Sequence, residues 1–194
     1  EAGTQLNARS PSDRKIWTIG SGLPTGLNNF TLSQKTALQP LMWDSSGKNP
    51  TDAQVENLIN FVRGFDAFDE DGDSAINDKR WMLADIYHSE IAVVGAPMAE
   101  TSDEVADSHT EAYYRHKKGY KTFKELHDKR QSTVYAGAND GMLHAFDSKT
   151  GRELWAFIPP AMLPRFHEME PTRPNTSVAI YGVDGSPVVR DVFY

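Results

Sequence analysis

The chain has 194 residues, of which 39% are hydrophobic and 24% charged, and its formal net charge is -7. This length and composition predict a folded chain of about one domain, or one domain and part of a second. The excess of carboxylates disfavours nucleic acid or an anionic membrane as a partner. The absence of cysteine excludes disulfides, thiolate zinc sites, iron–sulfur clusters and covalent haem attachment, and it leaves the redox compartment undecided.

The sequence predicts no membrane span and no signal peptide. No apolar run approaches the roughly 20 residues that cross a bilayer. The first ten residues, EAGTQLNARS, lack the basic start and apolar core of a secretory signal. Because Glu1 is not an initiator methionine, we expect the chain to be a processed product or a piece of a longer protein.

Residues 1–50 are predicted to be rich in loops, because prolines and glycines interrupt them. Residues 1–9 could close a helix, and RKIWTI is a candidate strand. Residues 51–80 are predicted to hold a helix and an acidic loop. In NPTDAQVENLINFVRG, Thr51 and Gln54 have the spacing of a capping box, apolar residues recur at helical intervals, and Gly64 supplies the stop.

Residues 81–194 are predicted to be mainly β. EIAVVGAP is typical of a buried strand, whereas YYRHKKGYKTFKELHDKR predicts a helix around Tyr120 and Phe123. From Thr133 the pattern alternates, so STVYAGA, MLHAFD and ELWAFIP are predicted strands, separated by turns at residues 139–141 and 148–151. SVAIYGVDGSPVVRDVFY repeats the pattern of strand, Asp-Gly turn and strand.

The stretch AFDSKTGRELW combines a tight turn with a large packing residue. Asp147, Thr150 and Gly151 are suited to the turn, and Trp155 offers a flat surface for a neighbouring unit. The spacing A-x-D-x-x-T-G-x-x-x-W resembles the blade repeat of pyrroloquinoline-quinone dehydrogenases and their β-propeller relatives. We interpret these residues as structural, since blade-packing residues face other blades and not a cofactor.

A wider set of motifs resembles one particular family. INFVRGFD, RWMLADIYHSEIAVVGAP, VYAGANDGMLHAFD, ELWAFIPPAMLP and YGVDGSPVVRDVF occur in the order and rough spacing of the PilY/PilC-type proteins of type IV pili. AGTQLNARSPSDRKIWT is similar to the stretch that follows this family's von Willebrand A-like region. The resemblance implies an exported protein of Gram-negative bacteria at the cell surface or pilus tip, with pilins, minor pilins or other tip subunits as partners. It also implies a role in pilus assembly and adhesion, to a receptor that the sequence does not identify.

The predicted fold class is therefore α+β and mainly β: the first blades of an incomplete quinoprotein-like β-propeller over residues 81–194, preceded by a loop-rich and helical segment. A closed propeller needs at least about four blades of 40 to 45 residues, and the length after Arg80 leaves room for two or three. We expect a missing segment or a second chain to complete the propeller. An apolar final strand, VVRDVFY, would otherwise expose a pairing edge.

The acidic stretch FDAFDEDGDSAINDKRW is a candidate calcium loop. Carboxylate, carbonyl and amide oxygens at alternate positions suit Ca²⁺, which binds about six to eight oxygens. The match to an EF-hand is incomplete, because glycine is displaced to Gly72 and Arg80 stands where a bidentate glutamate belongs. Asp66 or Asp78 could complete the ligand set, and the alternative is a solvated acidic linker. The candidate ligands are Asp69, Asp71, Asp73, the Ala75 carbonyl, Asn77 and Asp78.

Other polar groups favour structural roles. His109 with His116, or His144 with His167, could approach one another, but the sequence contains no close ligand spacing. The run Asp85, His88, Ser89 is not expected to form a catalytic triad, because neighbouring side chains seldom converge. The basic run at residues 113–130 favours a solvated helical face over a nucleic-acid or polysaccharide site.

The leading functional hypothesis is a non-enzymatic surface protein of type IV pili, with calcium regulation as an open feature. One alternative is a fragment of a quinone-dependent dehydrogenase propeller, for which further blades would have to supply the cofactor ligands. Another is a complementing subunit of an extracellular filament assembly, in which the incomplete propeller is the interface.

Overall fold

A computed structural model of the chain describes residues 1–43, 50–100, 109–170 and 178–191. The α-helices are α1 (Ala2–Asn7), α2 (Lys35–Met42), α3 (Asp52–Arg63), α4 (Glu111–Lys117) and α5 (Tyr120–Leu126), and the 3-10 helices are η1 (Pro11–Asp13), η2 (Leu32–Gln34) and η3 (Pro160–Met169). The strands are β1 (Ile16–Thr18), β2 (Ala92–Val94), β3 (Thr133–Gly137), β4 (Leu143–Asp147) and β5 (Glu153–Ile158).

Helix α3 begins and ends at the residues that its sequence indicates. The Thr51 hydroxyl accepts a hydrogen bond from the Gln54 amide, and the Gln54 side chain accepts one from the Thr51 amide, which completes the capping box. Gly64 closes the helix with a φ of 114°, a left-handed conformation that residues with a β-carbon rarely adopt. The predicted helix is confirmed.

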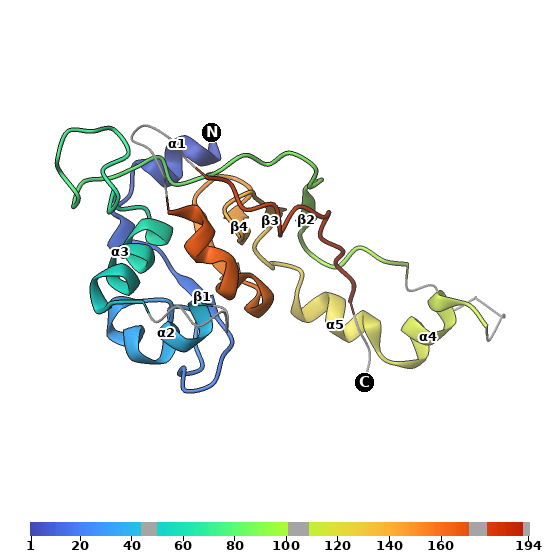
Figure 1. Ribbon diagram of the computed structural model, residues 1–194. Helices are drawn as coiled ribbons and strands as arrows, with labels where there is room; N and C mark the ends of the chain where they lie inside the picture. The colour runs from blue at the N-terminus through green and yellow to red at the C-terminus, as the bar shows by residue number, and fades with distance from the viewer. Residues whose placement is uncertain (44–49, 101–108, 171–177, 192–194) are drawn as a thin grey trace.

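The described strands form one mixed sheet in the order β1-β5-β4-β3-β2 (Figure 1). Strands β2 to β5 are an antiparallel meander, in which each strand pairs with the next one in the chain. Strand β1 joins the outer edge of β5 in parallel, with Ile16 opposite Ala156. A four-stranded antiparallel meander is the unit of a propeller blade, so the described residues contain a single blade with a fifth strand added.

The two faces of this sheet differ. On one face Ile16, Ala156 and His144 are neighbours across three strands, and each is fully buried. This face joins a core built from α2, α3 and η3, in which Phe30 meets Phe166 edge-on at 6.0 Å. The opposite face carries half-buried aromatic side chains, because successive residues of a strand point to opposite sides. We name it the aromatic face, and its residues are Trp17, Tyr135, Trp155 and Phe157.

One sequence-based expectation for residues 81–130 needs correction and another is confirmed. The strand expected in EIAVVGAP is present as β2, but Val93 is 60% exposed because β2 is an edge of the sheet. The helix predicted around Tyr120 and Phe123 is present as α5, and a second short helix, α4, precedes it. Gly119 separates them with a φ of 73°, which ends the first helix and turns the chain.

The strand pair predicted for SVAIYGVDGSPVVRDVFY is also not found in its described part, residues 178–191. There Ile180 makes one isolated bridge to Asp140, and the rest is irregular. The segment instead crosses the body of the molecule and reaches α5 (Figure 1). Residues 192–194, which end the apolar strand expected in VVRDVFY, lie outside the described residues.

Residues 1–50 contain more regular structure than their loop-rich composition indicates. Helix α2 forms although Pro40 lies inside it, and it packs against η3 near the other end of the sequence. Strand β1 becomes part of the blade sheet. The division of the chain at residues 50 and 80 stays a prediction, and the sheet itself crosses both boundaries.

Candidate functional site

The acidic loop, residues 65–79, leaves α3 and returns to the same place. Phe65 and Lys79 form an antiparallel bridge, and the Asp66 amide donates to the Asp78 carbonyl at 3.0 Å. The Arg80 amide donates to the Gly64 carbonyl at 3.1 Å. The two ends are therefore fixed, and the loop between them extends from the body of the molecule (Figure 1).

Carboxylates shape the backbone inside this loop. One oxygen of Asp69 accepts from the Ser74 amide at 2.9 Å, and one of Asp71 accepts from the Asp73 amide at 3.2 Å. One oxygen of Asp73 accepts from the Ala75 amide at 2.7 Å. Each carboxylate has further lone pairs, so these hydrogen bonds orient the aspartates and leave them able to bind a cation.

Two overlapping carboxylate triplets result. Asp66, Asp69 and Asp71 form the first, Asp71, Asp73 and Asp78 form the second, and within each triplet the nearest oxygens lie within 4.8 Å of one another. The Oδ1 atom of Asp78 is shielded from solvent and has no hydrogen-bond partner among the described residues. Desolvation, followed by the negative charge of Asp73, raises the pKa of Asp78.

The other loop residues have different surroundings. Asn77 lines a hollow of about 450 Å³ together with Asn28 and Asn60, and none of the triplet aspartates lines it. Ala75 is exposed. Arg80, at the position of the EF-hand glutamate, pairs with Glu70 at 2.6 Å. The structure thus brings four of the six predicted ligands together and adds Asp66, which the sequence offered as an alternative to Asp78.

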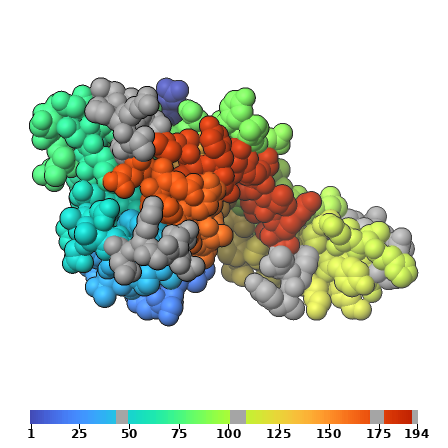
Figure 2. Space-filling view, in the orientation of Figure 1, coloured from blue at the N-terminus to red at the C-terminus, as the bar shows by residue number. Residues whose placement is uncertain are grey.

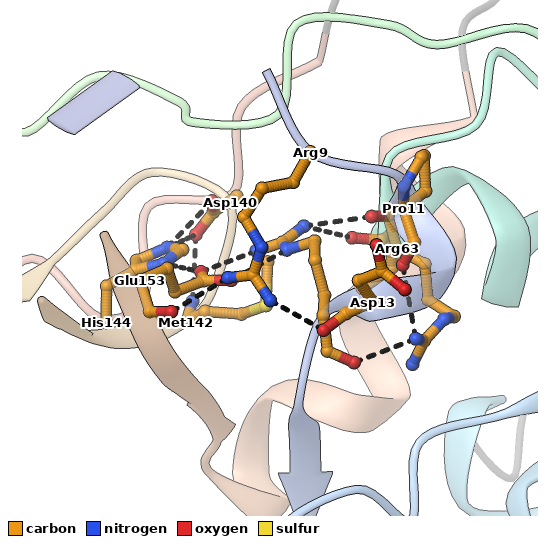
Figure 3. A network of polar contacts seen from close by, with 10 residues as sticks. Arg9, Pro11, Asp13, Arg63, Asp140, Met142, His144 and Glu153 are labelled. Atoms are coloured by element: carbon orange, nitrogen blue, oxygen red, sulfur yellow. Dashed lines mark hydrogen bonds and ion pairs between the residues drawn. The ribbon is translucent and has the colours of Figure 1, made fainter. Parts of the chain in front are cut away.

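A second polar cluster is buried behind the blade (Figure 3). Arg14 donates from Nε and a terminal nitrogen to the two oxygens of Glu153, at 3.0 and 2.9 Å. His144 contacts Glu153 through Nδ1 at 2.9 Å and Asp140 through Nε2 at 3.0 Å. The remaining terminal nitrogen of Arg14 donates to the carbonyls of Val62 and Arg63 at the end of α3.

Opposite charges set the protonation of this network. Burial alone lowers the pKa of His144, but the negative charge and hydrogen bonds of Asp140 and Glu153 outweigh it and raise that pKa to about 9. Burial raises the pKa of Glu153, and Arg14 and His144 outweigh burial and lower it. Burial and the charge of Arg14 lower the pKa of Arg63 to about 10. At neutral pH His144 and Glu153 are therefore a charged pair, whereas Arg63 is a buried cation that donates to backbone carbonyls.

The predicted turn before β5 is built by the residues that the sequence indicates. One oxygen of Asp147 accepts from the Thr150 amide at 2.7 Å and from the Thr150 hydroxyl at 2.8 Å. Gly151 has a φ of 71°. Trp155 lies 6.1 Å from Trp17 and 5.8 Å from Tyr135, ring centre to ring centre. The four residues predicted to be structural, Asp147, Thr150, Gly151 and Trp155, therefore make contacts or adopt conformations that build the blade.

His144 and His167 have different partners. His167 stacks on Trp43 with ring centres 6.2 Å apart, whereas His144 contacts Glu153 and Asp140. His88 pairs with Asp184 at 2.5 Å and not with Asp85. Sequence reasoning missed the Arg14–Glu153–His144 network. One signal was available: Glu153 and His144 occupy inward positions of strands whose other inward residues are apolar.

These features define a class of protein. A four-stranded antiparallel meander with an Asp-Thr-Gly turn before its last strand is a β-propeller blade. A family profile described as "PilY1 beta-propeller domain" matches residues 83–194. The chain belongs to the PilY1 family.

Curated relatives extend this similarity over the whole chain. The "Type IV pilus biogenesis factor PilY1" of Pseudomonas aeruginosa (strain UCBPP-PA14) is 32% identical over 100% of the chain, and that of strain PAK is 35% identical over 93%. The "Type IV pilus biogenesis factor PilY1 homolog" of Xylella fastidiosa (strain Temecula1) is 31% identical over 81% of the chain. The chain spans 16%, 15% and 12% of these relatives' own lengths.

No solved structure matches the chain significantly. Among the helices of the described residues, none combines the length and the apolar character that a bilayer crossing requires.

Proposed function

We propose that the chain is the segment that leads into the propeller, with its first blade, of a non-enzymatic type IV pilus protein. In this proposal the protein is exported, acts at the surface or pilus tip of a Gram-negative cell, and serves pilus assembly and adhesion. The single observation that carries the proposal is the family's blade, present in both sequence and structure. Supporting it, the motif shared with quinone enzymes is used here for a turn and for packing.

A gene deletion tests this function. Loss of the encoding gene should reduce piliation and surface attachment while quinone-linked dehydrogenase activity of the cells stays the same. Restoring the intact gene should restore both phenotypes. Normal pili together with normal attachment in the deletion strain would contradict the proposal.

The aromatic face is the proposed contact for the rest of the propeller, whether on the same polypeptide or on a second chain. Blades of a propeller pack face to face, and Trp17, Tyr135 and Trp155 are only half buried here. Since the chain contains no cysteine, single cysteines report on this contact. Tyr135→Cys should react with a maleimide in the 194-residue chain and be protected in the complete propeller. Ser148→Cys, in the exposed turn, should react in both, and equal reactivity of Tyr135→Cys in both would contradict the contact.

The second part of the proposal is that the acidic loop binds Ca²⁺. Its support is the convergence of four predicted ligands, Asp69, Asp71, Asp73 and Asp78, together with the unpartnered Asp78 oxygen. A bound divalent cation would reduce the repulsion between the carboxylates and would give the unpartnered Asp78 oxygen a cation to bind. In the protein, the cation would hold the aspartates of the loop together.

Calorimetric titration with Ca²⁺ tests this part separately. Asp71 belongs to both triplets, so Asp71→Ala should weaken binding more than a change of any other loop residue. Asp128→Ala, an exposed aspartate outside the loop, is the control and should bind as the wild type does. An absence of heat with the wild-type chain would end the calcium proposal and leave the pilus proposal intact.

A further inference from the structure

A basic helical hairpin interrupts the blade between its first two strands. We name residues 109–130, which contain α4 and α5, the basic lobe. Consecutive antiparallel strands are usually joined by about two to five residues, whereas β2 ends at Val94 and β3 begins at Thr133. Figure 2 shows the lobe standing at one end of the molecule, away from the core. The basic lobe contributes no strand to the described sheet.

The charge of the basic lobe is opposite to that of the chain. Seven lysines and arginines against three carboxylates give residues 109–130 a formal charge of +4, while the whole chain has -7. Elsewhere Arg14, Lys35 and Arg80 pair with carboxylates. Within the described part of the chain, the five lobe lysines have no such partner, and four of them are exposed. The five are Lys117, Lys118, Lys121, Lys124 and Lys129, with Lys124 half buried.

The lobe is nevertheless held in place. Tyr120 is 2% exposed and donates its hydroxyl to Asp191 at 2.9 Å. Arg130 donates to the Gly95 carbonyl at 2.7 Å and lies 3.6 Å from a second oxygen of Asp191. The chain before Asp191 therefore runs along the lobe. Between them lies an open groove of about 630 Å³, lined by residues that include Tyr114, Arg115 and Arg190.

Exposed apolar side chains accompany the charges. Tyr114 is 52% exposed and Leu126 75% on the lobe, and Val188 is 82% and Val189 44% exposed on the segment beside it. Tyrosine and arginine are among the residues enriched at protein interfaces. A surface that combines unpaired cations with exposed Tyr, Leu and Val fits a ligand with both carboxylates and apolar side chains.

We infer that the basic lobe and residues 188–191 form a docking surface for an acidic protein segment that also carries apolar side chains. The cations of the surface call for carboxylates on the partner, because opposite charges are complementary. The exposed valines, leucine and tyrosine call for apolar side chains on the partner. A polysaccharide would use the cations and leave the aliphatic side chains exposed. This inference is independent of the calcium loop and of the aromatic face.

Selection from a random peptide library displayed on phage tests the inference with the 194-residue chain as bait. The selected peptides should be rich in Asp and Glu and should contain aromatic or aliphatic residues. Their affinity should fall with added salt. It should also fall by about tenfold in the triple variant Lys118→Gln, Lys121→Gln, Lys129→Gln, because that variant removes three exposed charges. The paired change Leu126→Ser, Val188→Ser should weaken the same peptides without removing their salt dependence.

Control variants and control ligands distinguish a specific docking surface from non-specific binding by positive charge. Lys15→Gln with Lys149→Gln removes two exposed charges elsewhere and should leave the affinity unchanged. Heparin and vesicles of anionic phospholipid are tested in parallel. The inference is overturned if the library yields no acidic consensus, if the control pair weakens binding as much as the lobe variant, or if heparin or vesicles bind while the peptides do not.

Discussion

Arg14 and Glu153 lie 139 positions apart in the sequence and form a two-point ion pair whose side chains are both 0% exposed. The pair fastens the chain just before β1 to the first residue of β5. His144 and the carbonyls at the end of α3 complete the contacts of this pair. The blade, the N-terminal segment and α3 are therefore one electrostatic unit, although the sequence presents them as separate pieces.

Removing the charge of Glu153 should destabilise the fold strongly. Glu153→Gln leaves Arg14 and His144 buried with less compensating charge, and the loss of one member of a buried pair costs about 3–5 kcal/mol. The free energy of unfolding in urea measures this. Glu125→Gln, on the exposed side of α5, should change that free energy by less than about 0.5 kcal/mol. A loss below about 1 kcal/mol for Glu153→Gln would show that the pair behaves like a surface salt bridge.

The stability of the chain should fall as pH rises above neutrality. The pKa of His144 is about 9 in the folded chain against an ordinary 6.5. Its contribution is therefore fully present below pH 6.5 and is lost as pH rises through 9, with a size on the order of 3 kcal/mol. Urea unfolding at several pH values measures the slope. His144→Gln should flatten that slope, and equal slopes in variant and wild type would contradict the assignment.

Asp78→Asn should act in opposite directions with and without calcium. Because burial and neighbouring aspartates raise the pKa of Asp78, its ionised form opposes folding at neutral pH. The variant should therefore melt at a higher temperature than the wild type in chelator. In excess Ca²⁺ the wild type should gain stability by ligand linkage, and the variant should gain less. A variant that loses stability in chelator would contradict the electrostatic account.

Gly137→Ala should dislodge the segment that crosses the sheet. A β-carbon at this position would lie 2.1 Å from the Val183 carbonyl oxygen, which is backbone and has no free rotamer to escape. We expect the free energy of unfolding to fall by about 1–3 kcal/mol. We also expect faster proteolytic cleavage within residues 178–191. Gly95→Ala, whose nearest neighbour is 3.7 Å away, is the matched control. Unchanged cleavage in Gly137→Ala would mean that the segment is not packed on β3.

The features that the sequence predicts well are those with local causes. The capping box of α3, the alternation in β3 to β5 and the turn at Asp147 each depend on residues a few positions apart. The aspartates of the acidic loop are also close in the sequence, and their role as a calcium ligand set stays a prediction. Their convergence in two triplets follows from short-range hydrogen bonds to backbone amides.

Features with distant causes were not predictable in the same way. Nothing within RKIWTI indicates that β1 pairs in parallel with β5. Val188 and Val189 have strand propensity, yet neither lies in a strand of the described sheet, and Val188 is 82% exposed. The partner of Glu153, Arg14, lies near the other end of the sequence, so the residues around Glu153 do not indicate their ion pair.

The parallel pairing of β1 with β5 has a consequence for the order of assembly. A chain delivered N-terminus first presents β1 before any of its partners exist, and Ala156 follows Ile16 only after about 140 further residues, a matter of roughly 7–30 s at ordinary rates of synthesis. During that time β1 and Arg14 have to be kept from other pairings. The sheet of the blade is therefore completed when β1, its first strand to be synthesised, pairs with β5, its last.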